Sequence, residues 1–378
     1  MKRPSVVLIG PWNFHSGAGE ACRGILKALW QLQQSYRIYP IGVPCYGPHR
    51  MFSSINASLP VNLNPDVVIV HLNPDTAPAL LTQQQRGLLE RANHRVGYWL
   101  WETMQVPQGW GQALSWVDSI WVPSQYCEQL FAGLTERPIR IIPHVVEEQT
   151  AGHSVAANQQ SSRTSRTILY IFDGASYLRR KNPAALVRAF HQAGLAEDGW
   201  RLCLKTKNLN PAGYDPDYFE DFQRALAEAR QRHADSIELI DADFNDAQLR
   251  SLLQSAAIYA SPHASEGFGL TIAEAMAAGV LVVATDYGGT HDLLDPDTGF
   301  PVKFNLIAEP LGFGSYQEGC VWAKVDEKHL SEQLRAAAQV SESAVGLSIR
   351  QAAQIKLASR CSLKVVAKRI DAALQEIL

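Results

Sequence analysis

The stretch that decides how this chain folds is SPHASEGFGLTIAEAMAAGVLVVATDYGG, residues 261–289. It places Glu266 in a glycine-rich loop and Glu274 in an alanine-rich run that predicts a helix from about Leu270. Glycine lets a ligand approach the backbone closely, and the first turn of a helix offers unpaired N–H groups to an anion. Because the carboxylates would repel phosphate, we expect them to accept hydrogen bonds from hydroxyls instead. We expect the phosphate site on the backbone of Gly267, Phe268, Gly269, Leu270 and Thr271.

The two glutamates, the glycines after Glu266 and the Gly288-Gly289 pair together resemble the signature of retaining glycosyltransferases of the GT-B fold, in the fourth sequence family (glycosyl transferases group 1). The resemblance implies an α/β protein with two Rossmann-like domains, each a doubly wound parallel sheet, that face a central cleft. It implies that a hexose moves from a nucleotide-sugar donor to a glycan or lipid-linked acceptor, with retention at the anomeric carbon. Glu266 would then hold the hydroxyls of the transferred sugar and Glu274 those of the ribose.

Further segments, among them GYWLWE at 97–102 and WAKVD at 322–326, resemble bacterial members that build polysaccharides and other surface glycans. Such members often use mannose or rhamnose, so the likeness favours GDP-mannose over UDP- or dTDP-sugars. It also implies a cytoplasmic enzyme with peripheral contact to the inner face of the membrane. GT-B enzymes generally work without a divalent ion, and no aspartate cluster in the sequence suggests a metal site.

Alternating apolar runs and amphipathic segments predict two α/β halves. Strands are expected at Ser5–Gly10, 37–43, 66–71, 95–101, 119–123 and 140–143, and again from 167–173 onwards. The intervening stretch 147–166 is polar and lacks apolar periodicity. We therefore expect a first domain over 1–150 on the acceptor side, a linker over 151–166 and a donor-binding domain over 167–360. The amphipathic segment 361–378 predicts a helix, which by the resemblance crosses back to the first domain.

A basic triplet follows the strand expected at 167–173: Arg179, Arg180 and Lys181 stand just before Pro183, where a helix can begin. Cations beside a helix start can neutralise a diphosphate. Family members carry a similar lysine after this strand, and Lys181 aligns best with it. Many members also have an arginine directly after a glycine here, whereas this chain has Ala175 after Gly174. Whether Arg179 or Arg180 takes that role stays open in the sequence.

The loop after the first expected strand contains Gly17 and Gly19, whose small size lets the backbone approach a phosphate or sugar. The loop is not a dinucleotide fingerprint, because the next glycine comes at Gly24, two places late. In the resembled family it faces the donor diphosphate or the acceptor. Many members also place a histidine near the sugar at the end of the strand expected at 95–101. In this chain that place falls to Trp101 or Glu102.

Composition excludes several classes of protein. A net charge of −3 over 378 residues gives no basic field for nucleic acid, and the six cysteines show no CxxC spacing of a zinc site. The opening MKRPSVVLIGPWNF is expected to form a strand, since its apolar run is too short for a signal peptide. No run in the chain approaches the roughly 18 apolar residues of a membrane span.

Three other functions fit parts of the pattern. A sugar-nucleotide epimerase of GT-B fold would bind the same donor without an acceptor. A non-catalytic sugar-nucleotide-binding protein would not need Lys181, Glu266 and Glu274 together. An oxidoreductase is disfavoured by the glycine spacing of the first loop.

Overall fold

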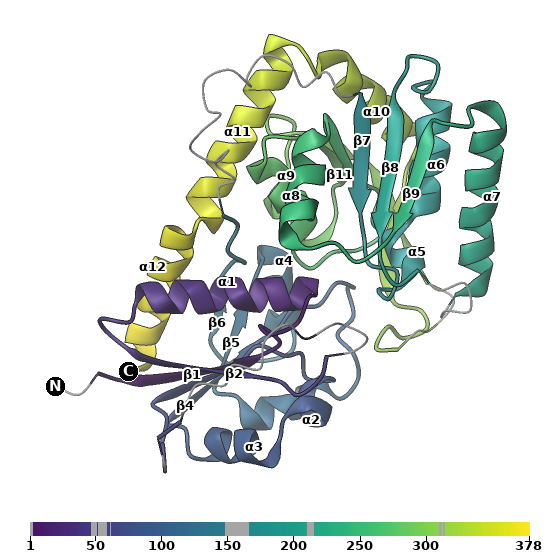
Figure 1. Cartoon of the computed structure of the whole chain (residues 1–378). Helices are drawn as coiled ribbons and strands as arrows, with labels where there is room; N and C mark the ends of the chain where they lie inside the picture. Colours follow the sequence, from purple (N-terminus) through teal and green to yellow (C-terminus); the bar gives the residue numbers. More distant parts are fainter. Residues whose placement is uncertain are drawn as a thin grey trace. The chain divides into compact units, whose positions relative to one another are not determined.

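The computed structural model describes residues 3–46, 51, 59–60, 62–147, 166–209, 215–309, 312 and 314–378. The chain divides into two compact units. The amino-terminal unit comprises Met1–Glu147 and Ser359–Leu378, and the carboxyl-terminal unit comprises Glu148–Ala358. Within the described residues each unit is built on one six-stranded parallel sheet with helices packed against it (Figure 1). This confirms the predicted fold class. The expected linker lies outside the described residues, apart from Arg166.

The sheet of the amino-terminal unit has the strand order β2-β1-β3-β4-β5-β6. Its central strands are fully buried runs of apolar residues, as expected where helices cover both faces of a parallel sheet. The expected strand at 95–101 is shorter in the structure, where β4 ends at Tyr98 and the rings of Trp99 and Trp101 pack edge-on against the ring of Trp110. The strands are β1 (Ser5–Gly10), β2 (Arg37–Gly42), β3 (Val67–Val70), β4 (His94–Tyr98), β5 (Ser119–Val122) and β6 (Ile139–Ile141).

Helices cover this sheet from both sides. Alternate residues of β1 point to opposite faces: Val6 and Leu8 enter a core shared with α1 and α12, and Val7 and Ile9 enter a core that includes Leu88 of α3. The helices of this unit are α1 (Gly17–Gln31), α2 (Ala77–Leu80), α3 (Gln83–Glu90), α4 (Gln125–Ala132) and α12 (Leu363–Ile377), with a 3₁₀ segment η1 (Trp110–Trp116).

The last helix, α12, belongs to the amino-terminal unit although it closes the sequence. It lies beside α1 (Figure 1), and Val366, Ile370 and Leu374 on one of its faces are completely buried. Two polar contacts hold its position: the Tyr36 hydroxyl donates to Asp371 at 2.7 Å, and Arg140 pairs with Glu376 at 2.6 Å. The apolar stripe read from the sequence is therefore the stripe that α12 buries.

The sheet of the carboxyl-terminal unit has the order β12-β11-β10-β7-β8-β9, and α6 and α7 lie on one side of it while α8 and α9 lie on the other (Figure 1). Its strands are β7 (Thr167–Ile171), β8 (Arg201–Thr206), β9 (Ile237–Asp241), β10 (Ile258–Ser261), β11 (Leu281–Thr285) and β12 (Phe300–Val302). Its helices in this part are α5 (Leu178–Lys181), α6 (Pro183–Gln192), α7 (Pro216–Arg232), α8 (Asp246–Ser255) and α9 (Leu270–Ala277), with a 3₁₀ segment η2 (Gly288–Asp292).

The segment between η2 and α12 received no assignment from the sequence. In the structure it forms β12, an antiparallel pair of strands and two long helices, of which α10 packs against α6, β11 and β12. The pair is β13 (Phe304–Ala308) and β14 (Val321–Val325), and the helices are α10 (Glu327–Val340) and α11 (Ala344–Cys361). The exposed apolar residues Val345, Leu347 and Ile355 blur the pattern of α11, which explains why its periodicity is weak.

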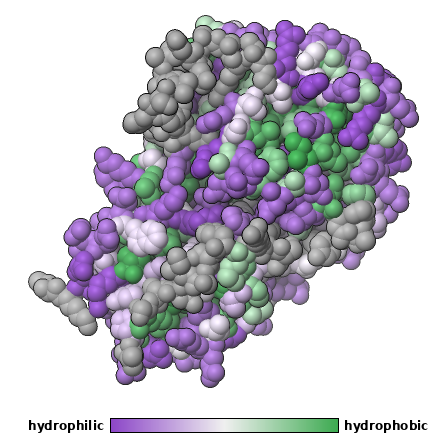
Figure 2. Space-filling model, viewed as in Figure 1, coloured by the Kyte–Doolittle hydropathy of each residue, from purple (hydrophilic) through white to green (hydrophobic). Residues whose placement is uncertain are grey.

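In the face drawn in Figure 2, hydrophilic residues surround smaller hydrophobic areas. Among the helices that the structure describes, none combines the length and the apolar character that a membrane crossing requires.

The buried face of α12 generates a stability prediction. Replacing Ile370 by Ala is expected to destabilise the amino-terminal unit by about 2–5 kcal/mol, because it leaves a cavity between α12 and the sheet. Urea unfolding followed by tryptophan fluorescence would measure the change, since seven of the nine tryptophans lie in this unit. The exposed Lys368→Ala is the control, and equal midpoints for the two variants would show that α12 adds nothing to stability.

Candidate functional site

The order of the strands brings two loops of the carboxyl-terminal unit together. Strands β7 and β10 are neighbours, but the chain leaves β7 towards β8 on one side and leaves β10 towards β11 on the other. In doubly wound sheets such a reversal leaves a crevice at the carboxyl ends of the two strands, where ligands bind. Lys181 follows β7 and Glu266 follows β10, so residues far apart in the sequence meet at this point.

Backbone and side-chain hydrogen bonds join the two loops directly. The Ala264 N–H donates to the Arg180 carbonyl at 2.7 Å, and the Asn182 amide donates to the Pro262 carbonyl at 3.1 Å. The hydroxyl of Tyr170, on β7, donates to the Lys181 carbonyl at 2.7 Å. The backbone that carries Arg180 and Lys181 is thus fixed against the loop that carries Glu266.

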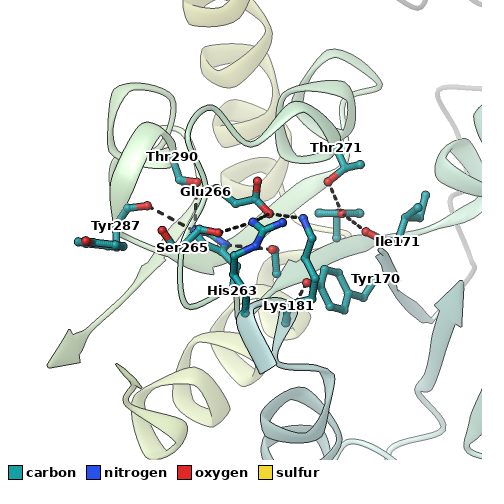
Figure 3. A network of polar contacts seen from close by, with 12 residues as sticks. Tyr170, Ile171, Lys181, His263, Ser265, Glu266, Thr271, Tyr287 and Thr290 are labelled. Carbon is teal, nitrogen blue, oxygen red and sulfur yellow. Dashed lines mark hydrogen bonds and ion pairs between the residues drawn. The ribbon is translucent and has the colours of Figure 1, made fainter. Parts of the chain in front are cut away.

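The carboxylate of Glu266 forms ion pairs with two cations (Figure 3). Its Oε1 atom lies 2.5 Å from Nζ of Lys181 and 3.3 Å from Nη1 of Arg180. Arg180 is buried, and the same Nη1 atom donates to the Ser265 carbonyl at 2.8 Å. The structure therefore brings together Lys181, Arg180 and Glu266, three residues that the sequence singled out.

This arrangement keeps Glu266 ionised. Burial by itself would raise the pKa of Glu266, but the charges of Lys181 and Arg180 outweigh burial and hold that pKa at about 2. The ion pair is only partly screened by water, since the Glu266 side chain is 18% exposed and that of Lys181 16%.

Arg179 is directed elsewhere. Its guanidinium pairs with Asp215 at 2.7 Å and lies over the ring of Tyr218, 5.5 Å from the ring centre. Asp215 also accepts from the Tyr218 N–H and thereby caps the start of α7. The triplet forms the short helix α5, on which Arg179 faces Asp215 while Arg180 and Lys181 face Glu266.

Helix α9 begins where the sequence placed it. Gly269 is its N-cap residue with a φ of 85°, a conformation that favours glycine, and Leu270 is the first helical residue. The Tyr259 hydroxyl lies 2.8 Å from the hydroxyl of Thr271 in the first turn and 3.2 Å from the Ile171 carbonyl of β7. Because the tyrosine hydroxyl carries one hydrogen, both bonds form when it donates to Ile171 and accepts from Thr271. Phe268 is buried beside this turn. The start of α9 is thus attached to the carboxyl ends of both β10 and β7.

Two glycines after β11 allow the Glu266 loop to take its shape. A Cβ atom on Gly289 would lie 2.1 Å from the Gly267 carbonyl oxygen, and one on Gly288 would lie 2.3 Å from that of Glu266. The Gly289 N–H donates to the Glu266 carbonyl at 2.7 Å. A side chain at either position would displace the loop, so the glycine pair is required by close packing.

Glu274 lies half-buried on α9, one turn beyond Leu270. Burial raises the pKa of Tyr259, and the charges of Glu274 and Glu266 raise it further. The charges of both carboxylates therefore reach the same tyrosine hydroxyl.

His263 is a site residue that the sequence did not single out, although it is the third residue of the stretch 261–289. This histidine is completely buried; its Nδ1 lies 3.0 Å from the Ser261 hydroxyl and its Nε2 lies 3.2 Å from the Thr290 hydroxyl (Figure 3). Burial lowers the pKa of His263 to about 4, so the ring is neutral at pH 7. It connects β10 with η2 beneath Glu266. Its place three residues before Glu266 was the available signal.

Four candidate site residues lie in the amino-terminal unit. A Cβ on Gly19 would lie 2.1 Å from the Phe14 carbonyl oxygen, so Gly19 is needed for the turn itself, whereas Gly17 is exposed with open space around it. Glu102 is half-buried, and its carbonyl accepts from the Tyr126 hydroxyl at 2.8 Å. Trp101 is buried and donates from its indole nitrogen to Thr103, so its ring belongs to the core.

The described residues contain no group of three or more histidine, cysteine, aspartate or glutamate side chains arranged to hold a metal ion.

Comparison with known proteins adds to this description. A family model described as Glycosyl transferases group 1 matches residues 166–310, which include α5, α9 and the loop between β10 and α9. No curated protein matches the chain.

Solved structures resemble the whole chain. A glycosyltransferase from Rickettsia africae ESF-5 has a TM-score of 0.68 at 15% identity, over 100% of this chain and 99% of its own. A sucrose-phosphate synthase from Thermosynechococcus elongatus has a TM-score of 0.68 at 13% sequence identity, and the match covers 99% of each chain. HepE of Anabaena, crystallised with UDP and glucose, has a TM-score of 0.66 at 13% sequence identity, over 99% of this chain and 100% of its own. These likenesses establish the fold as GT-B.

The ion pair of Glu266 predicts a dependence of stability on pH. Because the pKa of Glu266 falls from 4.5 to about 2 on folding, its contribution is complete above pH 4.5 and is lost as the pH falls towards 2. At pH 7 the Glu266→Gln variant is expected to be less stable by about 1–3 kcal/mol. Calorimetry should show that the difference in the free energy of unfolding between the variant and the unchanged protein becomes smaller at acid pH. A difference that stays constant down to about pH 3 would contradict the ion pair.

Proposed function

We propose that this protein is a glycosyltransferase that moves a hexose from a nucleotide-sugar donor to an acceptor. The observation that carries the proposal is the meeting of Lys181, Arg180 and Glu266 at the strand reversal, next to the start of α9. The same residues lie inside the region that matches the glycosyl transferases group 1 model. The likeness to a solved glycosyltransferase and to HepE of Anabaena, crystallised with UDP and glucose, supports a nucleotide sugar as donor.

Lys181 and Arg180 would bind the diphosphate of the donor. The N–H groups at the start of α9, from Gly269 to Thr271, would add the positive end of the helix dipole. As the glycosidic bond breaks, negative charge develops on the departing diphosphate, and donors that are already in position stabilise that charge. These groups do so without a metal ion, and we propose that the enzyme needs none.

The carboxylates would select the two sugars of the donor. Glu266 is the residue for hydroxyls of the transferred hexose, and Glu274, further along α9, is the residue for the ribose. In the amino-terminal unit we keep Gly17 and Gly19 as candidates for the donor diphosphate or the acceptor, and Glu102 as a candidate near the hexose. Retention at the anomeric carbon is part of the proposal and is supported by the resemblance of the glutamate signature.

The finer points of the proposal concern the partners. We propose a glycan or a lipid-linked glycan as acceptor, and a cytoplasmic protein that touches the inner face of the membrane. GDP-mannose is the first donor to test. UDP-glucose is the second, because HepE of Anabaena was crystallised with UDP and glucose.

A donor panel tests the function. The protein is incubated in EDTA-containing buffer with GDP-mannose, UDP-glucose and dTDP-rhamnose, with and without glycan acceptors, and nucleotide release is followed. We expect release from one donor, faster when the acceptor is present. Release that is independent of every acceptor, with an epimerised sugar, would indicate the epimerase instead. Activity that EDTA abolishes and Mg²⁺ restores would overturn metal independence.

Substitutions in α5 test the diphosphate site. Lys181→Ala should lower turnover by about two orders of magnitude, as loss of a positioned donor to a developing anion does. Arg179→Lys is the matched control, because it keeps a cation beside the buried Asp215 and Arg179 does not contact Glu266, and it should change turnover by less than about threefold. Steady-state kinetics with circular dichroism would distinguish the two. Equal losses in both variants would contradict the assignment of Lys181.

A further inference from the structure

The Glu266 carboxylate is already paired with the two cations, Lys181 and Arg180, that a diphosphate would need. Its Oε1 atom accepts a hydrogen bond from Lys181 Nζ at 2.5 Å and forms an ion pair with Arg180 Nη1 at 3.3 Å. A phosphate oxygen would bind through charge-assisted hydrogen bonds from the same two cations. A carboxylate and a phosphate oxygen cannot both hold that position, because both are anions and would repel each other at contact distance.

The two cations differ in how firmly they are held. Arg180 is buried and its guanidinium also donates to the Ser265 carbonyl, so it stays in place whatever anion it faces. Lys181 is fixed through its backbone by Tyr170, but its ammonium lies at the end of a flexible side chain with three donors. The bond between Lys181 and Glu266 is therefore the contact that an incoming diphosphate can exchange.

Displacing Glu266 has a cost that depends on the ligand. An ionised carboxylate in a partly buried site is stabilised by hydrogen-bond donors. If Lys181 turns to the ligand, Glu266 loses its closest donor, and this costs free energy. A nucleoside diphosphate brings no further donor to this side of the site. An intact sugar donor brings hydroxyl groups, which can replace the lysine as partners of the carboxylate.

We propose that Glu266 is a built-in competitor of the donor diphosphate, which makes the site bind an intact nucleotide sugar in preference to the nucleoside diphosphate that remains after transfer. The inference rests on the proposed function, since it takes the diphosphate of a nucleotide sugar as the ligand of Lys181 and Arg180. It assigns Glu266 a second role besides contact with the hexose: the carboxylate weakens binding of the product and thereby assists its release.

The test is a comparison of binding constants. Calorimetry would measure the affinity of the nucleoside diphosphate and of the matching nucleotide sugar, without acceptor, for the unchanged protein and for Glu266→Gln. We expect the variant to bind the nucleoside diphosphate about tenfold more tightly, because a neutral amide no longer competes for Lys181 and Arg180. Its affinity for the nucleotide sugar should rise less or fall, so the preference for the intact donor shrinks.

A matched control is available in the same unit. Glu327 pairs with Arg188 at 2.7 Å, so Glu327→Gln removes the same charge from another ion pair and should leave both affinities within about twofold. In the Lys181→Ala background the gain from Glu266→Gln should largely disappear, because the shared partner is gone. If Glu266→Gln folds poorly, Glu266→Asp, which withdraws the carboxylate by one methylene, should give a smaller gain in the same direction.

The outcomes separate this inference from the proposed function. Unchanged or weaker binding of the nucleoside diphosphate by a folded Glu266→Gln variant would overturn the competition. If no nucleotide sugar is used as a donor, inorganic pyrophosphate serves as the probe. Tighter pyrophosphate binding by Glu266→Gln would still support the competition while the proposed function fails, and equal binding would overturn the competition as well.

Discussion

The pairing of strands β7 and β10 is the constraint on which the candidate site depends. The chain leaves these neighbours in opposite directions, so the loops that follow them meet at their carboxyl ends. Lys181 and Glu266 come together there at 2.5 Å, and the backbone bond from Ala264 to Arg180 fixes the two loops to each other. A change in strand order would separate the cations from the carboxylate even if every element kept its own structure.

Close packing beneath the loop is the second requirement. Gly288 and Gly289 lie so near the backbone of residues 266 and 267 that a Cβ atom would displace it, and the buried ring of His263 joins β10 to η2. These contacts hold the Glu266 carboxylate where two cations reach it. A carboxylate held in this way keeps its charge, so the site presents one anion and two cations, an arrangement suited to exchange one anion for another.

Several features could be predicted from residues alone. The buried strand β1, the start of α9 at Leu270 and the apolar face of α12 follow from local pattern, because periodicity reports which side of an element is buried. Other features could not. The strand expected at 95–101 ends at Tyr98, and Trp99 then packs against Trp110 of a separate segment, a contact that periodicity does not report. Helix α11 has too mixed a surface to be recognised.

For the site, the sequence by itself determined which residue types were present: two glutamates, a basic triplet and glycines that permit close approach. Only the tertiary structure decided which of these residues contact one another. It directs Arg179 to Asp215 and leaves Arg180 and Lys181 to face Glu266, and it places His263 beneath the loop. The physical reason is that the strength of an ion pair depends on distance and burial, which are set by strand order and helix packing. The sequence specifies only which residues carry a charge.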